Sequence, residues 1–172
     1  MWGHVGYGGD RWGMMGRAAA NVGMGRWAAV FLGTHTLRMD EKGRVALPAR
    51  FRERLADGLI VTRGQENCVS VFPLAEFTRR SDALSLVPST GPKVRDYQRL
   101  MYSAADDPTP DKQGRVVINL ELRRYAGLQR DCVAVGSNTH FEIWDSDAWR
   151  RFLDDREPLF ARMDSEVVPG LV

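Results

Sequence analysis

An internal repeat of about 70 residues is the feature that most constrains how this chain folds. Residues 40–48 (DEKGRVALP) match residues 111–119 (DKQGRVVIN) at an offset of 71, and the match continues, with one residue inserted, through two further strands and a final helix. Two unrelated hairpins would not agree over so many ordered features. Because one copy is too small to bury both faces of a sheet, we expect the two copies to close one shared barrel.

Each copy begins with a D-x-x-G-R turn, which predicts a hairpin. An aspartate at the first position and a glycine at the fourth suit a type I turn. An apolar run follows each turn and is typical of a buried strand. The arginine four residues after the aspartate can pair with it and brace the turn. The structural turn motif is expected to comprise Asp40, Arg44, Asp111, Gly114 and Arg115.

Helical spacing appears between the copies and at the end of the second. Val94, Tyr97 and Met101 share one face of a helix predicted over residues 93–103. Ser146 is expected to cap a last helix. The predicted fold class is therefore a β-rich α+β protein with short strands and flanking helices.

Composition changes abruptly at residue 30. Residues 1–29 hold 8 of the 17 glycines, 3 of the 5 tryptophans and 4 of the 7 methionines. They carry three arginines and one aspartate, which is the whole net charge of +2, so the sequence pI of about 8.7 is no argument for nucleic-acid binding. We expect residues 1–29 to be a disordered or non-native leader, 30–103 the first repeat, 104–160 the second repeat, and 161–172 a flexible tail.

The genetic code offers an account of this leader. Trp-Gly is encoded by TGG-GGN and Met-Gly by ATG-GGN, so both dipeptides require the tetranucleotide TGGG. The leader contains such pairs at Trp2-Gly3, Trp12-Gly13, Met15-Gly16 and Met24-Gly25. Val30 can be encoded by GTG, a bacterial start codon. The leader is therefore interpreted either as a disordered arm or as the translation of upstream DNA in which TGGG recurs.

Composition and motifs also exclude several classes of function. Apolar residues make up 44% and charged residues 27%, close to the globular average, and no stretch approaches the ~18 apolar residues of a membrane span. Cys68 and Cys132 are too few for a zinc site or a disulfide scaffold, and no catalytic triad or phosphate loop is recognisable. We expect an intracellular protein that is not an enzyme, with no metal, cofactor, small-molecule substrate or membrane partner.

The first turn is the best candidate for a binding site. Residues 35–44 carry a net charge of +1, whereas residues 106–115 carry −1. An arginine fork can bind phosphate or read guanine, and a two-stranded ribbon fits the major groove of DNA. The alternative is that the arginine of each turn only braces it. From this turn onward, residues 38–54 hold six cations against three carboxylates, a local charge of +3; the cations are Arg38, Lys42, Arg44, Arg50, Arg52 and Arg54.

The chain resembles the MraZ family. The resemblance rests on residues 30–34 (VFLGT), 40–52 (DEKGRVALPARFR) and 111–115 (DKQGR), and it extends from residue 30 to about residue 160. It implies two SpoVT/AbrB-type swapped-hairpin repeats that form a double-split β-barrel. It also implies a homo-oligomeric ring, octameric or dodecameric, that is cytoplasmic and nucleoid-associated. Such a ring would bind double-stranded DNA at G-rich direct repeats upstream of its own division and cell-wall gene cluster, as a transcriptional regulator.

Residues 42–44 match the DNA-contacting loop of that family. The predicted DNA-binding residues are accordingly Arg38, Lys42, Gly43, Arg44 and Arg50. The chain departs from the family in its leader and in the acidic stretch after Phe160. Two other functions remain open: a ring-forming structural or interaction protein of the division machinery, and an antitoxin-like DNA-binding module.

Overall fold

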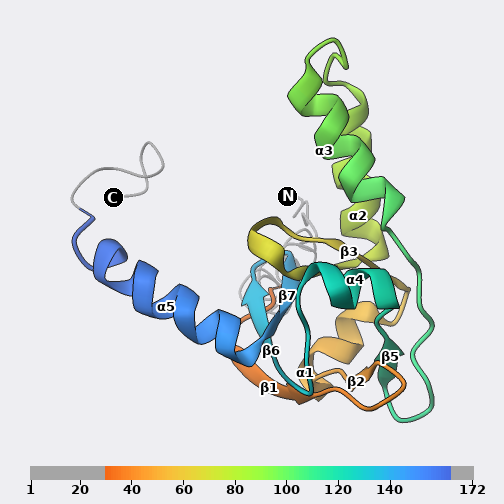
Figure 1. Ribbon diagram of the computed structural model, residues 1–172. Coiled ribbons are helices and arrows are strands. Elements are labelled where there is room, and N and C mark those ends of the chain that lie inside the picture. The colour runs from red at the N-terminus through yellow and green to blue at the C-terminus, as the bar shows by residue number, and fades with distance from the viewer. Residues whose placement is uncertain (1–29, 164–172) are drawn as a thin grey trace, which may run out of the picture.

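The computed structural model describes residues 30–163 (Figure 1). The expectations for the leader, residues 1–29, and for residues 164–172 of the tail lie outside the described residues. From the first copy come β1 (Thr34–Arg38), β2 (Arg44–Ala46), α1 (Ala49–Arg52), the 3-10 turn η2 (Glu53–Leu55), β3 (Leu59–Arg63), the 3-10 turn η3 (Gln65–Asn67), β4 (Val69–Pro73) and α2 (Leu74–Ser85). The second copy contributes β5 (Arg115–Val117), α4 (Leu120–Tyr125), β6 (Asp131–Ser137), β7 (His140–Asp145) and α5 (Ser146–Phe160), and α3 (Pro92–Ser103) connects the copies.

The strands of the two copies interleave in antiparallel sheets. The larger sheet has the order β1-β6-β7-β4-β3, and the smaller one pairs β2 with β5. Strand β1 of the first copy therefore pairs with β6 of the second, while Val61 on β3 forms a bridge with Asp106 of the second copy. The predicted mixture of helices with an antiparallel sheet is confirmed, and each copy extends the sheet of the other.

A pseudo-two-fold axis relates the two copies. Val45 and Val116, which are equivalent in the repeat, face each other in the β2–β5 ladder. Ser70 and Glu142, equivalent once the inserted residue is counted, face each other in the β4–β7 ladder. An antiparallel pair centred on equivalent residues is what a two-fold axis produces. The copies therefore share one sheet and one core.

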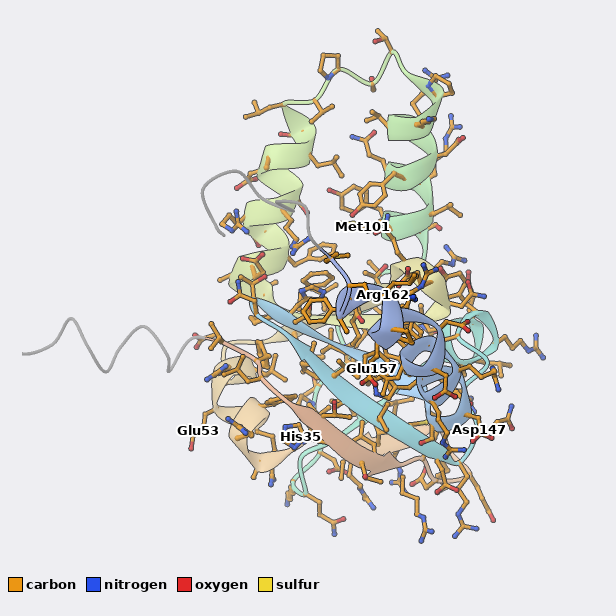
Figure 2. The ribbon with its side chains drawn as sticks, turned by 90° about the vertical axis from the view of Figure 1, so that its left-hand side faces the viewer. His35, Glu53, Met101, Asp147, Glu157 and Arg162 are labelled. Atoms are coloured by element: carbon orange, nitrogen blue, oxygen red, sulfur yellow. The ribbon has the colours of Figure 1, made fainter. Side chains whose placement is uncertain are left out.

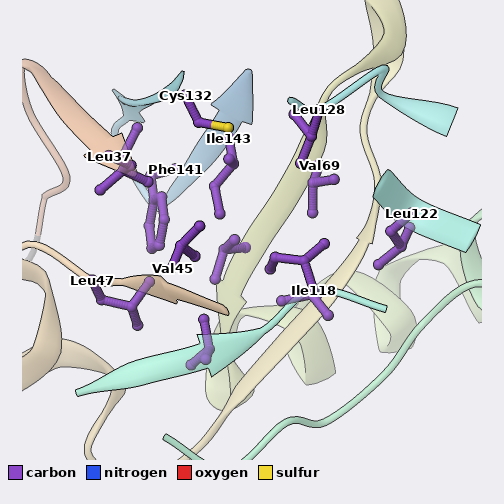
Figure 3. Packing of buried hydrophobic residues seen from close by; sticks show 14 of the residues in the cluster. Leu37, Val45, Leu47, Val69, Ile118, Leu122, Leu128, Cys132, Phe141 and Ile143 are labelled. Atoms are coloured by element: carbon purple, nitrogen blue, oxygen red, sulfur yellow. The ribbon is translucent and has the colours of Figure 1, made fainter. Parts of the chain in front are cut away.

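Side chains from both sheets meet in this core (Figure 3). Alternate residues of two central strands point into this core: Cys132 and Ala134 on β6, and Phe141 and Ile143 on β7. This period of two places one face of the larger sheet inside. Val45 from the small sheet closes the core on the opposite side and is fully buried.

Two helical arms leave the body. Helices α2 and α3 form a hairpin that rises from the sheet, and α5 extends from the end of β7 (Figures 1 and 2). Met101, labelled at the base of the hairpin in Figure 2, is buried, whereas Leu86 at the end of α2 is 84% exposed. Arg63 fixes the base, because its Nη1 donates to the Leu100 carbonyl at 2.8 Å and to Ser103 Oγ at 2.9 Å.

The helix predicted over residues 93–103 is confirmed as α3. The cap predicted at Ser146 is wrong, because Asp145 is the N-cap residue of α5. Its Oδ1 accepts from the N–H groups of Asp147 at 3.1 Å and Ala148 at 3.2 Å. A carboxylate at this position satisfies free N–H groups and interacts favourably with the helix dipole. No helix within residues 30–163 combines the length and apolar character needed to cross a membrane.

Candidate nucleic-acid interface

The carboxylate of Asp40 accepts hydrogen bonds across the first turn and stabilises it. Asp40 Oδ1 accepts hydrogen bonds from the backbone N–H groups of Lys42 and Arg44, each at 2.9 Å, and Oδ2 accepts one from Arg44 Nε at 2.7 Å. Gly43 has a φ of +75°, which favours glycine, and its N–H donates to the Asp40 carbonyl at 2.9 Å. These bonds hold the turn in one conformation before any ligand binds.

The second turn repeats this geometry with different charges. Asp111 Oδ1 accepts from the N–H groups of Gln113 at 2.9 Å and Arg115 at 3.0 Å, and Oδ2 accepts from Arg115 Nε at 2.8 Å. Gly114 has a φ of +71°. The structure thus places all the residues of the expected turn motif in two closely similar turns. Gln113 stands where Lys42 stands in the first copy, so the second turn lacks that cation.

Each turn packs against an arginine of the other copy. A Cβ at Gly43 would lie 2.8 Å from Arg123 Cζ on α4, and a Cβ at Gly114 would lie 2.7 Å from Arg52 Nη1 on α1. The backbones of the two copies also contact each other at this point, since the Ile118 N–H donates to the Gly43 carbonyl at 2.9 Å. The turn glycines therefore serve two needs, a positive φ and room for a guanidinium group from the other copy.

A basic depression opens beside the first turn. Its charged lining residues are Arg38, Lys42, Arg44, Arg123, Arg130, Asp40 and Glu41. Five of these are cations and two are carboxylates, one of which already bonds the arginine of the turn. The cations come from both copies, because Arg123 lies on α4 and Arg130 directly precedes β6. The depression therefore carries an excess of positive charge that no single stretch of sequence provides.

A depression beside Arg52, next to the segment that leads into the second turn, has a different character. Its charged lining residues are Asp57, Asp107 and the one cation Arg52, among leucines and prolines. Thr109 stands where Arg38 stands in the first copy. Two cations of the first copy, Arg38 and Lys42, are thus replaced by uncharged residues in the second, while Lys112 stands where Glu41 stands.

The cations of the basic depression differ in the hydrogen bonds and ion pairs that they already form. Arg44 uses Nε for Asp40, and among the described residues its two Nη groups have no hydrogen-bond partner. Arg38 Nε lies 3.4 Å from Asp131 Oδ1, but both side chains are largely exposed, and such pairs contribute little in water. Arg123 forms no ion pair within residues 30–163, and its Nε is buried without an acceptor. The Nη groups of Arg44 and the exposed side chain of Arg38 therefore remain to donate to an anionic ligand.

The six cations of residues 38–54 lie in different places in the structure. Arg52 lies against the second turn, and Arg54 lies over the ring of Phe31, with 5.1 Å between Cζ and the ring centre. Arg50 is exposed on α1, the helix that also carries Arg52, and does not line the basic depression. Of the six cations of residues 38–54, only Arg38, Lys42 and Arg44 line the basic depression, because β2 carries the chain away from the first turn and toward the second.

Sequence reasoning missed Arg123 and Arg130, which complete the basic depression from the second copy. A signal existed in the repeat itself. Arg123 is the counterpart of Arg52 at the same offset of 71, and pairing β2 with β5 brings each of these arginines to the opposite turn.

The described residues contain neither a cluster of metal ligands nor a thiol with a lowered pKa. Between residues 30 and 163, no group of three or more histidine, cysteine, aspartate or glutamate side chains is placed to hold a metal ion. Cys68 and Cys132 are free and buried. Burial raises the pKa of Cys132 to about 12 and raises that of Cys68 further. Both thiols stay protonated near neutral pH and belong to the packing.

The two turn aspartates predict a pH dependence of stability. The Arg44 N–H holds the pKa of Asp40 below its ordinary value of 3.8, and the Arg115 N–H does the same for Asp111. Because the folded-state pKa is lowered, this stabilisation is present above about pH 3.8 and is lost as the pH falls below it. The melting temperature of the wild type, followed by circular dichroism, should exceed that of D40N/D111N at pH 7. The difference should shrink toward pH 3; a constant difference would contradict this account.

Comparison with known proteins places the chain among relatives. The model of the family described as "MraZ protein, putative antitoxin-like" matches residues 30–100 and again residues 101–167. A protein of Parafrankia sp. (strain EAN1pec) is 54% identical over 143 residues, one of Frankia alni 52% and one of Thermobifida fusca 50%. Each alignment covers 83% of this chain and 100% of the relative, and each relative is named "Transcriptional regulator MraZ". The double match coincides with the internal repeat, and the chain belongs to the MraZ family.

Proposed function

We propose that the chain is a sequence-specific DNA-binding regulator of transcription. It binds G-rich direct repeats upstream of its own gene in a division and cell-wall gene cluster, and so acts in the cytoplasm on the nucleoid. The name of the relatives supports a transcriptional regulator. The observation that carries the proposal for this chain is the excess of positive charge in the basic depression, beside a turn that is already fixed. A cationic site that needs no ordering binds a polyanion at little entropic cost.

The residues of the first turn have different roles in this proposal. Arg44, whose Nε is held by Asp40, keeps two Nη groups that can donate to O6 and N7 of a guanine. Lys42 carries a flexible ammonium group suited to a phosphate. Gly43 lets the turn approach the duplex closely, Arg38 adds a phosphate contact, and Arg50, outside the basic depression, would reach only flanking phosphates.

The fold proposed with this function is a double-split β-barrel. It would consist of two SpoVT/AbrB-type swapped-hairpin repeats, residues 30–103 and 104–160. Support comes from the reciprocal pairing of the copies, because β1 adds to β6 while the segment around Asp106 adds to β3. The β2–β5 ladder then joins the two hairpins at the axis.

The DNA that encodes residues 1–29 is the proposed binding target. The four TGGG tetranucleotides that the codons of this segment must contain begin 30, 10 and 27 base pairs apart. The first two spacings are close to whole turns of B-DNA, about 10–10.5 base pairs each, so those sites face one side of the duplex. Relatives align over 143 residues and the family match begins at residue 30, which supports translation from Val30.

The proposed assembly is a homo-oligomeric ring of eight or twelve copies. Apolar residues exposed on the two arms support contacts between copies: Leu86 is 84% exposed, Phe160 75% and Met163 57%. Several first turns on one ring would meet successive repeats, so that individually weak contacts gain through effective concentration. Sedimentation should give a species larger than a dimer, and Phe160→Ser should lower its mass. A wild-type monomer at all concentrations would contradict the ring.

Substitution of the two turn arginines tests the reading site. Both Arg44→Ala and Arg115→Ala remove a brace, so their effects on the melting temperature should be similar. Only Arg44→Ala should lose specific DNA affinity, on the order of 1–3 kcal/mol per engaged protomer. The measurement is a fluorescence-anisotropy titration at fixed salt, with the oligomeric state checked by sedimentation. The assignment is wrong if Arg115→Ala loses more affinity than Arg44→Ala at equal oligomeric state.

The DNA that encodes residues 1–29 tests the proposed target. The full chain should bind this genomic duplex more tightly than a duplex in which every TGGG is scrambled at constant base composition. Both duplexes carry the same phosphates, so the difference isolates base recognition from charge. Equal affinity for the two duplexes would favour a structural protein of the division machinery with incidental DNA affinity.

A further inference from the structure

Arg123 occupies an unusual position for a bracing residue. Its guanidinium group lies against Gly43, in the turn of the other copy, and lines the basic depression. Its Nε is buried, and no acceptor among the described residues serves it. A buried donor without a partner weakens the folded protein, so a purely structural role leaves this arrangement unexplained.

The charges around Arg123 add to this cost. Four further cations line the same depression: Arg38, Lys42, Arg44 and Arg130. Of the two carboxylates there, Asp40 is bonded to the turn, which leaves Glu41 facing this group of cations. Like charges gathered in one depression repel one another, and an anion bound among them relieves the repulsion.

The equivalent position at the second turn shows that the fold does not demand this concentration of charge. Arg52 packs against Gly114 as Arg123 packs against Gly43. At the second turn, however, Thr109 stands where Arg38 stands and Gln113 where Lys42 stands, and the depression beside Arg52 is lined by Asp57 and Asp107. Packing of an arginine on the turn glycine is thus common to both copies, whereas the additional cations Arg38, Lys42 and Arg130 are found only around Arg123.

We propose that Arg123 of the second repeat binds a backbone phosphate of the DNA that the first turn reads, with Arg130 beside it. The inference rests on the proposed function and adds to it that the DNA-binding surface is built from both repeats. A phosphate is the expected partner because Arg123 lies at the flank of the turn rather than at its tip. When a hairpin enters a major groove about 12 Å wide, its flank faces the sugar–phosphate wall.

Arg123→Gln is compared with Arg52→Gln in anisotropy titrations of the full chain, on the genomic duplex and on its scrambled version, over a series of salt concentrations. Arg123→Gln should weaken binding to both duplexes by about fivefold at 0.15 M salt and lower the salt slope by about 0.9 for each phosphate that is no longer neutralised. Arg52→Gln, which removes the same packing from the second turn, should change neither affinity nor slope. Arg123→Lys keeps the charge and should recover most of the slope.

Melting temperatures distinguish a structural role of Arg123 from a role in DNA binding. If Arg123→Gln is too unstable to titrate, Arg130→Gln, which removes an exposed cation of the same depression, takes its place with the same expected decrease in slope. Equal DNA affinity and slope in Arg123→Gln and the wild type, or equal decreases in Arg123→Gln and Arg52→Gln, would overturn the inference. A wild type without preference for the genomic duplex would instead count against the proposed function, because the phosphate contact is still measured on either duplex.

Discussion

Pairing of β2 with β5 is the interaction on which the rest of the structure depends. Each strand is only three residues long, and their ladder is centred on Val45 and Val116, which are both fully buried. Because each strand follows its turn directly, antiparallel pairing carries each turn to the place where the helix of the other copy begins. The turn glycine of one copy then meets an arginine of the other. Disruption of this short ladder would open both turns together.

Features set by near neighbours could be predicted from the sequence. The turns follow from the spacing of aspartate and glycine, because the carboxylate reaches N–H groups only two and four residues away. Helix α3 follows from the spacing of its apolar residues, and its base is buried at Met101. The MraZ resemblance rests on the same local patterns, and these occur in both copies, so the family model matches each copy.

Features that depend on distant partners could not be predicted in this way. Arg50 and Arg52 lie two residues apart on α1, and residues two apart lie on nearly opposite sides of a helix, so these two arginines do not share a face. Arg54 lies over an aromatic ring and Arg52 over the second turn. Arg123 joins the first turn only because the two copies interleave, and this is a property of strand pairing rather than of any short stretch of sequence.

The axis that relates the two copies also bears on the symmetry of the DNA. A dimer of identical chains with two equal reading turns matches an inverted repeat, because operator symmetry mirrors protein symmetry. Here both turns lie on one chain and differ in charge, so the axis relates the backbones but not the charges of the turns. Under the proposed function, such a chain would distinguish the two directions along a duplex. Copies arranged head to tail would then require every site to point the same way, and inverting a single site would remove it from the array as effectively as deleting it.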